Sequence, residues 1–206
     1  MSLDLKAEIV ARARTLGFDS CRIARCEPPR HGREFETWLA DGAAGEMDWL
    51  ERGAEKRGDP QKILPGARSV IVVALNYWQG ETGKNGRIAR YAWGDDYHDV
   101  MLGRLRALDD VLHTHGGLQK CYVDTGPILE RDYAAEAGIG WHGKSTMLLD
   151  QKLGTWFFLG EILTTLELSP DAPQVARCGT CTRCMTACPT GASGSRSPRA
   201  SRHSGS

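Results

Sequence analysis

The sequence predicts a mixed α/β (α+β) domain followed by a short cysteine-rich segment. Helical and strand-like stretches alternate over about residues 1–165, and the apolar, β-branched run Ser69–Asn76 is the best strand among them. Residues 178–189 then carry four cysteines in the spacing C-x2-C-x2-C-x3-C-P. A chain of 206 residues with a hydrophobic share of 41% has room for one packed domain, with or without a small appendage.

The N-terminal third predicts one helix, one strand and two shorter helices. Apolar residues recur at helical spacing over residues 3–16, and Gly17 supplies a stop. Residues 18–24 then have the composition of a strand. A short helix is expected over residues 33–41, where three apolar side chains share one face, and another around residues 47–50 after a glycine-rich break.

The central strand is bounded by a turn and a loop. Pro60 and Pro65 bracket the turn that precedes it. Ser69–Asn76 has an uninterrupted apolar core, which is typical of a strand buried on both faces. Residues 77–88 are polar and rich in glycine, so we expect a mobile loop there.

The second half of the domain continues the alternation. The longest expected helix is Asp96–His115, which has a regular leucine stripe and ends at a Gly-Gly pair. A strand at Leu118–Val123, a turn and a helix at Ile128–Ala137 follow. Two further strands are expected, at Thr146–Leu149 and Thr155–Thr164.

Charge and composition exclude some classes of function. The 26 basic residues balance 26 acidic ones, so the chain as a whole has no electrostatic footprint for nucleic acid. Its longest apolar run is too short to span a membrane, and its start lacks a secretory pattern, so we expect a cytoplasmic protein. The isolated cysteines Cys21, Cys26 and Cys121 are expected in the core. Residues 193–206, rich in serine and arginine, are expected to be disordered rather than RNA-binding.

The cysteine run predicts an iron–sulfur site. Three thiolates at this close spacing can surround one cubane cluster, and the fourth, which precedes a proline, typically ligates a second cluster. The alternatives are a zinc site, which more often pairs two knuckles across a longer gap, and a disulfide staple, which needs an oxidising compartment. The spacing favours iron–sulfur, with Cys178, Cys181, Cys184 and Cys188 as the metal ligands.

Asp124 is the candidate catalytic acid. It follows an expected buried strand and precedes a helix, where shielding from water would raise the pKa of its carboxyl group and suit it to proton donation. An aspartate in this place could equally cap the helix, and position alone leaves both roles open. Residues 138–143 read Gly-x-Gly-x-x-Gly, but they follow a helix instead of preceding one, which argues against a dinucleotide site.

Several motifs in order resemble one family. They are Asp124-Thr-Gly-Pro127, Glu130-Arg131, Gly140-Trp141-x-Gly143-Lys144, Leu159-Gly-Glu-Ile-Leu163 and the cysteine run. Three earlier motifs extend the match: Glu55-Lys56-Arg57, Pro65-Gly-Ala-Arg-Ser69 and Trp93-Gly94-x-Asp96-Tyr97-His98. Over about residues 1–192 the chain resembles epoxyqueuosine reductase, the cobalamin-dependent iron–sulfur enzyme of tRNA modification.

This resemblance implies a reaction, cofactors and partners. The family reduces the epoxide of epoxyqueuosine, at the wobble position of certain tRNAs, to the alkene of queuosine. Two 4Fe–4S clusters pass electrons to a cobalamin held over the α/β domain. The partners implied are that tRNA and an electron donor, with no membrane, and we expect a monomer.

The resemblance also assigns roles to single residues. By motif position Asp124 is the proton donor and also contacts the cofactor. The other expected cobalamin contacts are Arg57, Ala89, Leu148 and Leu159. His142 is expected at the surface or in a loop, Trp141 beside the corrin or in the core, and Lys144 in solvent or on a phosphate.

The chain departs from the family after residue 192. In the two-cluster pattern a late cysteine completes the set of Cys178, Cys181 and Cys184, and Cys188 joins the other cluster, but the later cysteines are absent here. We therefore expect a truncated or frameshifted product. Its parts would be a cobalamin-binding catalytic domain (1–165), a partial ferredoxin-type segment (166–192) and a tail (193–206). The alternatives are a non-catalytic cobalamin-binding remnant and a reductive dehalogenase-like protein.

Overall fold

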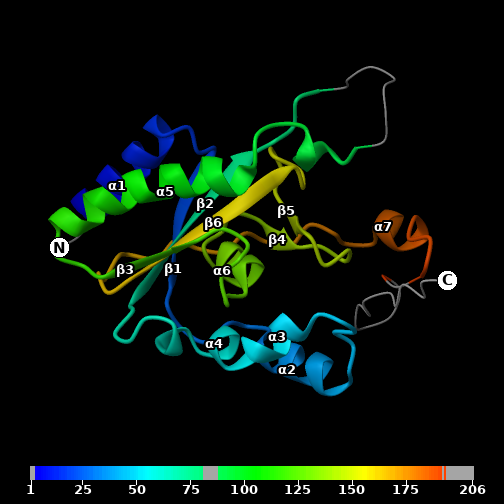
Figure 1. The fold of residues 1–206 in the computed structure, drawn as a ribbon. Coiled ribbons are helices and arrows are strands. Elements are labelled where there is room, and N and C mark those ends of the chain that lie inside the picture. The colour runs from blue at the N-terminus through cyan, green and yellow to red at the C-terminus, as the bar shows by residue number, and fades with distance from the viewer. Residues whose placement is uncertain (1–2, 81–87, 192, 194–206) are drawn as a thin grey trace.

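The computed structural model describes residues 3–80, 88–191 and 193 (Figure 1). The mobile loop expected over 77–88 and the disordered tail expected over 193–206 lie largely outside these residues. The mixed α/β class is confirmed. Its centre is a four-stranded antiparallel sheet in the order β1 (Ser20–Arg25), β2 (Ser69–Asn76), β6 (Phe157–Thr164) and β3 (Gln119–Tyr122). Because the strands are antiparallel, the arrangement is the α+β variant of the expected class.

The two central strands are covered on both faces, as the apolar run of β2 predicts. Val70 to Ala74 are fully buried, and their side chains alternate between the faces because successive residues of a strand point opposite ways. Ile71 and Val73 belong to the cluster under α1 and α5, whereas Val70, Val72 and Ala74 belong to the cluster under α6.

Two long helices cover the first face. They are α1 (Leu3–Thr15) and α5 (Tyr97–Thr114), which lie side by side over the sheet in Figure 1. The leucine stripe of α5 becomes core: Leu105, Leu108 and Leu112 are fully buried against Ile71 and Ile162. The expected positions of these helices differ from the structure by one residue at either end.

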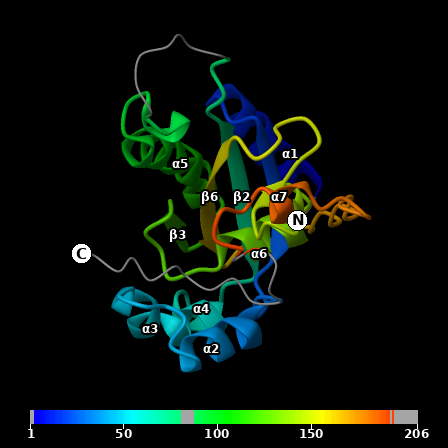
Figure 2. The same cartoon turned by 90° about the vertical axis from the view of Figure 1, so that its right-hand side faces the viewer.

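The second face is covered by α6 (Glu130–Glu136) and by shorter elements. A lobe of three short helices lies beyond α6 in Figures 1 and 2: α2 (Gly32–Ala40), α3 (Asp48–Arg52) and α4 (Ala54–Gly58). The remaining elements are η1 (Pro60–Lys62), η2 (Arg90–Ala92), the two-residue strands β4 (Trp141–His142) and β5 (Leu148–Leu149), and α7 (Arg183–Thr186).

Short elements account for most differences from the sequence predictions. Of the strand expected at Thr146–Leu149, only Leu148–Leu149 forms a strand. Its partner β4 has two residues, which is too few to show the alternation of side chains that predicts a strand. His142 therefore lies in a strand rather than a loop. Gly140 lets the two segments meet, because a Cβ there would lie 2.3 Å from the carbonyl oxygen of Leu149.

The segment after β6 stays attached to the domain. Leu166 and Leu168 are buried, and the Asp171 side chain accepts a hydrogen bond of 2.9 Å from the Ile23 N–H and pairs with Lys6 at 2.8 Å. Gln174 donates to the carbonyl oxygens of Gly138 and Ile139. Among the described residues no helix combines the length and apolar character that crossing a membrane would require.

Candidate active site

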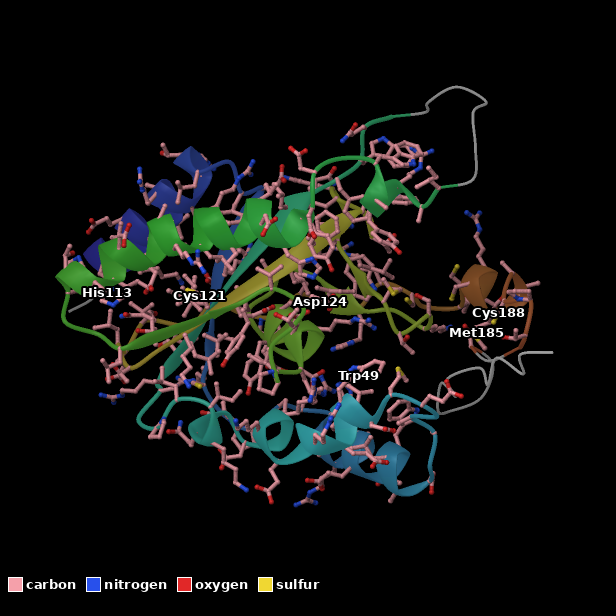
Figure 3. All side chains as sticks on the ribbon, viewed as in Figure 1. Trp49, His113, Cys121, Asp124, Met185 and Cys188 are labelled. Atoms are coloured by element: carbon pink, nitrogen blue, oxygen red, sulfur yellow. The ribbon has the colours of Figure 1, made fainter. Side chains whose placement is uncertain are left out.

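Asp124 lies on a sharp turn just beyond β3, near the middle of the molecule in Figure 3. Its φ of 57° is in the left-handed region, which an aspartate tolerates better than most residues. Its N–H donates to Glu130 Oε1 at 2.7 Å, and its Oδ2 accepts a hydrogen bond of 2.8 Å from the Tyr97 hydroxyl. The side chain is 64% exposed, so the shielding expected from its position is wrong.

The helix-cap role is also wrong. Helix α6 begins six residues later, at Glu130, and its N-cap is Leu129, which makes no side-chain cap hydrogen bond. The carboxylate of Asp124 instead points to groups on α5: the Tyr97 hydroxyl and, 3.8 Å away, Nε2 of His98. An exposed carboxylate held by a phenol is available to a reactant outside the domain.

Tyr97 is held firmly in place as the hydrogen-bond donor. Its ring stacks on Phe158, with centroids 4.0 Å apart and planes within 4°. Burial, and next the hydrogen bond to Asp124, raises the pKa of the phenol well above its usual range, so the hydroxyl keeps its proton. At the same end of α5, Asp96 caps the helix by accepting from the His98 N–H and also contacts His98 Nδ1 at 2.7 Å.

Two further carboxyl groups lie beneath the Asp124 loop. Glu161 is in the middle of β6, and strand alternation turns it away from Ile162 toward α6 and Glu130. It is fully buried, and neither of its oxygens accepts a hydrogen bond from a donor in the described part of the chain. Burial, and next the charge of Glu130, raises its pKa strongly.

The pKa of Glu130 is raised as well. Burial, and next the charge of Asp124, raises it to about 7. A carboxyl group with such a pKa is about half protonated at neutral pH, and ionisation of a second carboxyl group beside it is disfavoured. The two glutamates therefore favour a retained proton beneath the loop that carries Asp124.

The expected cobalamin contacts differ in how accessible they are. Arg57, in the last turn of α4, is half-buried beside Pro127 and Glu130, and its Nη1 has no hydrogen-bond partner among the residues that the structure describes. Ala89 is exposed at the start of η2. Leu148 and Leu159 pack with the same core cluster on the second face, where Leu148 is buried and Leu159 is partly buried.

The four cysteines of the run lie around α7, which Figure 3 shows at the opposite end of the molecule from His113. All are free thiols. Hydrogen bonds, first from the Ser193 backbone, lower the pKa of Cys188 to about 6, which favours the thiolate that metal ligation requires. By contrast, burial raises the pKa values of the isolated thiols Cys21 and Cys121 to about 12, as expected of core cysteines.

Lys144 connects the cysteine segment to the domain. Its Nζ donates to the carbonyl oxygens of Gly179 at 2.7 Å and Cys181 at 3.0 Å. Lys144 is thus not a freely solvated lysine. It holds the loop of the first two cysteines against the turn that follows β4.

Comparison with known proteins gives the family. Residues 57–125 match the family model described as epoxyqueuosine reductase QueG, DUF1730. The epoxyqueuosine reductase of Gloeobacter violaceus is 47% identical over 193 residues, covering 90% of this chain. The chain is a relative of the epoxyqueuosine reductases. It spans 60% of the length of the Gloeobacter protein.

Solved epoxyqueuosine reductases share the fold. One, bound to an epoxyqueuosine-modified stem loop of a tyrosine tRNA, has 32% identity and a TM-score of 0.83, covering 92% of this chain and 53% of that chain. The Bacillus subtilis enzyme, solved with an aspartate catalytic loop swung out of the active site, has 30% identity and a TM-score of 0.80. This match also covers 92% of this chain and 53% of that chain. A B12-dependent reductive dehalogenase, 17% identical with a TM-score of 0.57, covers 88% of this chain and 22% of its own and shares the fold alone.

The site contains three residues for which the sequence predicted no role: Tyr97, Glu130 and Glu161. An acid within the otherwise apolar strand Phe157–Thr164 is the signal that could have identified Glu161. Its partner could not have been identified, because Glu130 reaches it only through the packing of α6 on the sheet.

Proposed function

We propose that this chain is the cofactor-binding and proton-donating part of an epoxyqueuosine reductase, with epoxyqueuosine in tRNA as its substrate. The observation that carries the proposal is the exposed Asp124 carboxylate on the loop after β3, held by Tyr97. It occurs in a chain 47% identical to an epoxyqueuosine reductase, and the Bacillus subtilis relative is described with an aspartate catalytic loop.

The reaction breaks both C–O bonds of the epoxide, consumes two electrons and two protons, and releases the oxygen as water. Asp124 would donate a proton to that oxygen, since it is exposed to a substrate outside the domain. Tyr97 would keep the carboxyl group oriented between turnovers. The Glu130–Glu161 pair would hold a further proton under the loop.

A bound cobalamin would supply low-valent cobalt, which can deliver the electrons. Arg57, Ala89, Leu148 and Leu159 would hold it. The orphaned Nη1 of Arg57 fits this role, because a buried guanidinium nitrogen needs an acceptor and the amide side chains of a corrin provide one. The exposed position of Ala89 and the partly buried side chain of Leu159 fit a large, partly apolar ligand.

We further propose that Cys178, Cys181, Cys184 and Cys188 ligate 4Fe–4S clusters that pass electrons to this site. Free thiols in this spacing, one of them with a lowered pKa, have the chemistry that such clusters require. Residues 1–165 would be the cobalamin-binding unit, 166–192 the partial ferredoxin-type segment and 193–206 a tail. The protein would act in the cytoplasm as a monomer, with a separate electron donor.

The second candidate is a cobalamin-binding remnant without catalysis. It is favoured by one observation, that the sequence has no cysteine after Cys188 to complete the ligand sets of two clusters. A reductive dehalogenase-like function has only the shared fold in its favour.

One anaerobic experiment tests both candidates. The protein is reconstituted with iron and sulfide, mixed with cobalamin, and given a chemical reductant and an epoxyqueuosine-containing stem loop. A changed cobalamin spectrum with queuosine formed supports the enzyme, and the same change without queuosine supports the remnant. An unchanged cobalamin spectrum would refute both.

Asp124→Asn provides the residue-level test. Because the side chain is exposed, we expect the variant to fold normally and to form queuosine at least about 100-fold more slowly. Glu136→Gln, an exposed acid on α6, is the matched control and should keep the wild-type rate.

A further inference from the structure

A second constellation of functional groups lies apart from the Asp124 carboxyl group and the Tyr97 hydroxyl group. His31 directly precedes α2, Asp132 is in α6, and His142 is in β4. One ligand-type atom from each lies within 4.8 Å of the other two. We propose that these three residues form a binding site for a divalent transition-metal ion, with zinc as the reference ion.

The carboxylate is placed as a ligand would be. Asp132 is buried, and its Oδ1 lies 2.7 Å from His31 Nδ1 and 3.0 Å from His142 Nε2. Its other oxygen, Oδ2, accepts a hydrogen bond of 2.8 Å from the His31 N–H. Metal-bound carboxylates are commonly oriented by such a bond to the oxygen that does not ligate the ion.

The imidazole of His142 has a buried nitrogen without a hydrogen-bond partner among the described residues. Nε2 of His142 is buried, yet within the described residues its contact with Asp132 lacks the geometry of a hydrogen bond. Buried polar atoms are rarely unpaired, and an unpaired one usually indicates a water or an ion at the site. A metal ion between His142 and Asp132 would supply what the nitrogen lacks.

The separations suit a transition metal after a small adjustment. Ligand atoms about 2.1 Å from an ion are about 3.0 Å apart at right angles and about 3.4 Å apart in a tetrahedron. The 3.0 Å between His142 Nε2 and Asp132 Oδ1 already matches the right-angle value. The 2.7 Å between His31 Nδ1 and Asp132 Oδ1 must widen by a few tenths of an ångström. The two nitrogens, now up to 4.8 Å apart, must approach each other.

Exposure and donor type define the class of ion. The side chains of His31 and His142 are 41% and 29% exposed, so solvent can deliver an ion and fill its remaining positions. Two imidazoles and one carboxylate suit zinc and its late first-row neighbours, whereas magnesium and calcium prefer all-oxygen sites. The ion would fasten the beginning of α2 to α6 and β4.

Zinc titration tests the site, but the cysteine run would also bind zinc. The full chain is therefore used with Cys178, Cys181, Cys184 and Cys188 all replaced by serine, and zinc binding is followed by calorimetry at pH 7.5. We expect one equivalent to bind. Further replacement of either histidine by glutamine should weaken binding at least about tenfold.

Two features keep the result unambiguous. In His31→Gln the backbone N–H that orients Asp132 remains, so only the imidazole ligand is lost. His113→Gln, which removes a 60% exposed histidine of α5, is the control and should leave affinity unchanged. Circular dichroism confirms that each variant is folded.

Cobalt supplies a second readout. With cobalt in place of zinc, the serine variant should show visible d–d absorption that His142→Gln abolishes. Failure of the serine variant to bind zinc, or equal affinity in folded His142→Gln, would overturn the proposal. His31, Asp132 and His142 would then contact one another without binding an ion. Neither outcome depends on reductase activity, so the test is independent of the proposed function.

Discussion

The raised pKa of Glu130 makes stability depend on pH in a way that one substitution should remove. Glu130→Gln keeps the size of the side chain and an oxygen that can accept the hydrogen bond from the Asp124 N–H. It removes the titrating group, whose pKa burial, and next the charge of Asp124, raises to about 7.

The sign and size of the effect follow from linkage. A carboxyl group whose pKa is raised on folding stabilises the protein below its unfolded pKa and loses that contribution as pH rises through its folded pKa. For a shift from 4.5 to about 7, the loss between pH 5 and pH 8 is about 2.5 kcal/mol. The wild-type protein should lose this much more free energy of unfolding over that interval than Glu130→Gln does.

Urea denaturation, followed by tryptophan fluorescence at several pH values, measures the difference. Glu136→Gln on the exposed side of α6 serves as the control and should keep the wild-type pH dependence. If Glu130→Gln and the wild type lose equal stability between pH 5 and pH 8, the pKa of Glu130 is not raised on folding and the reasoning fails.

Three further predictions concern the backbone, the donor and the thiols. Gly140→Ala should lower the free energy of unfolding by about 1–3 kcal/mol because its Cβ meets a carbonyl oxygen. Gly103→Ala, in open space on α5, should instead raise the free energy of unfolding by up to about 1 kcal/mol, and urea denaturation of both variants measures these changes. Tyr97→Phe removes the hydrogen bond to the Asp124 carboxylate and, on the proposed function, should slow single-turnover queuosine formation about tenfold with folding intact; an unchanged rate would remove Tyr97 from the site. In the metal-free protein at pH 7, iodoacetamide should modify Cys188, whose pKa is about 6, well before Cys21, whose pKa is about 12; mass spectrometry showing the reverse order would contradict these shifts.

Much of the fold could be read from local patterns. Ser69–Asn76 was predicted with its observed ends because an uninterrupted apolar run leaves few other options. The helix α5 was predicted to within a residue at each end because its leucine stripe and Gly-Gly stop agree. The pair β4–β5 escaped prediction, since two residues per strand show no period.

The environment of Asp124 was harder to predict. Its place after a strand was correctly predicted. The predicted shielding of its side chain from water was wrong, because exposure depends on which elements cover the loop. A left-handed turn directs the carboxylate outward to Tyr97, a residue 27 positions earlier in the chain. Such a contact has no local signature.

The sequence by itself determined the mixed α/β class, the family likeness and the cysteine spacing, because periodicity and motifs are properties of neighbouring residues. Only the tertiary structure decided which distant side chains meet. Packing α6 on the sheet brings Glu130 to Glu161, and packing β4 against α6 brings His142 to Asp132. Burial then raises the pKa values of the two glutamates, and burial depends on the whole fold.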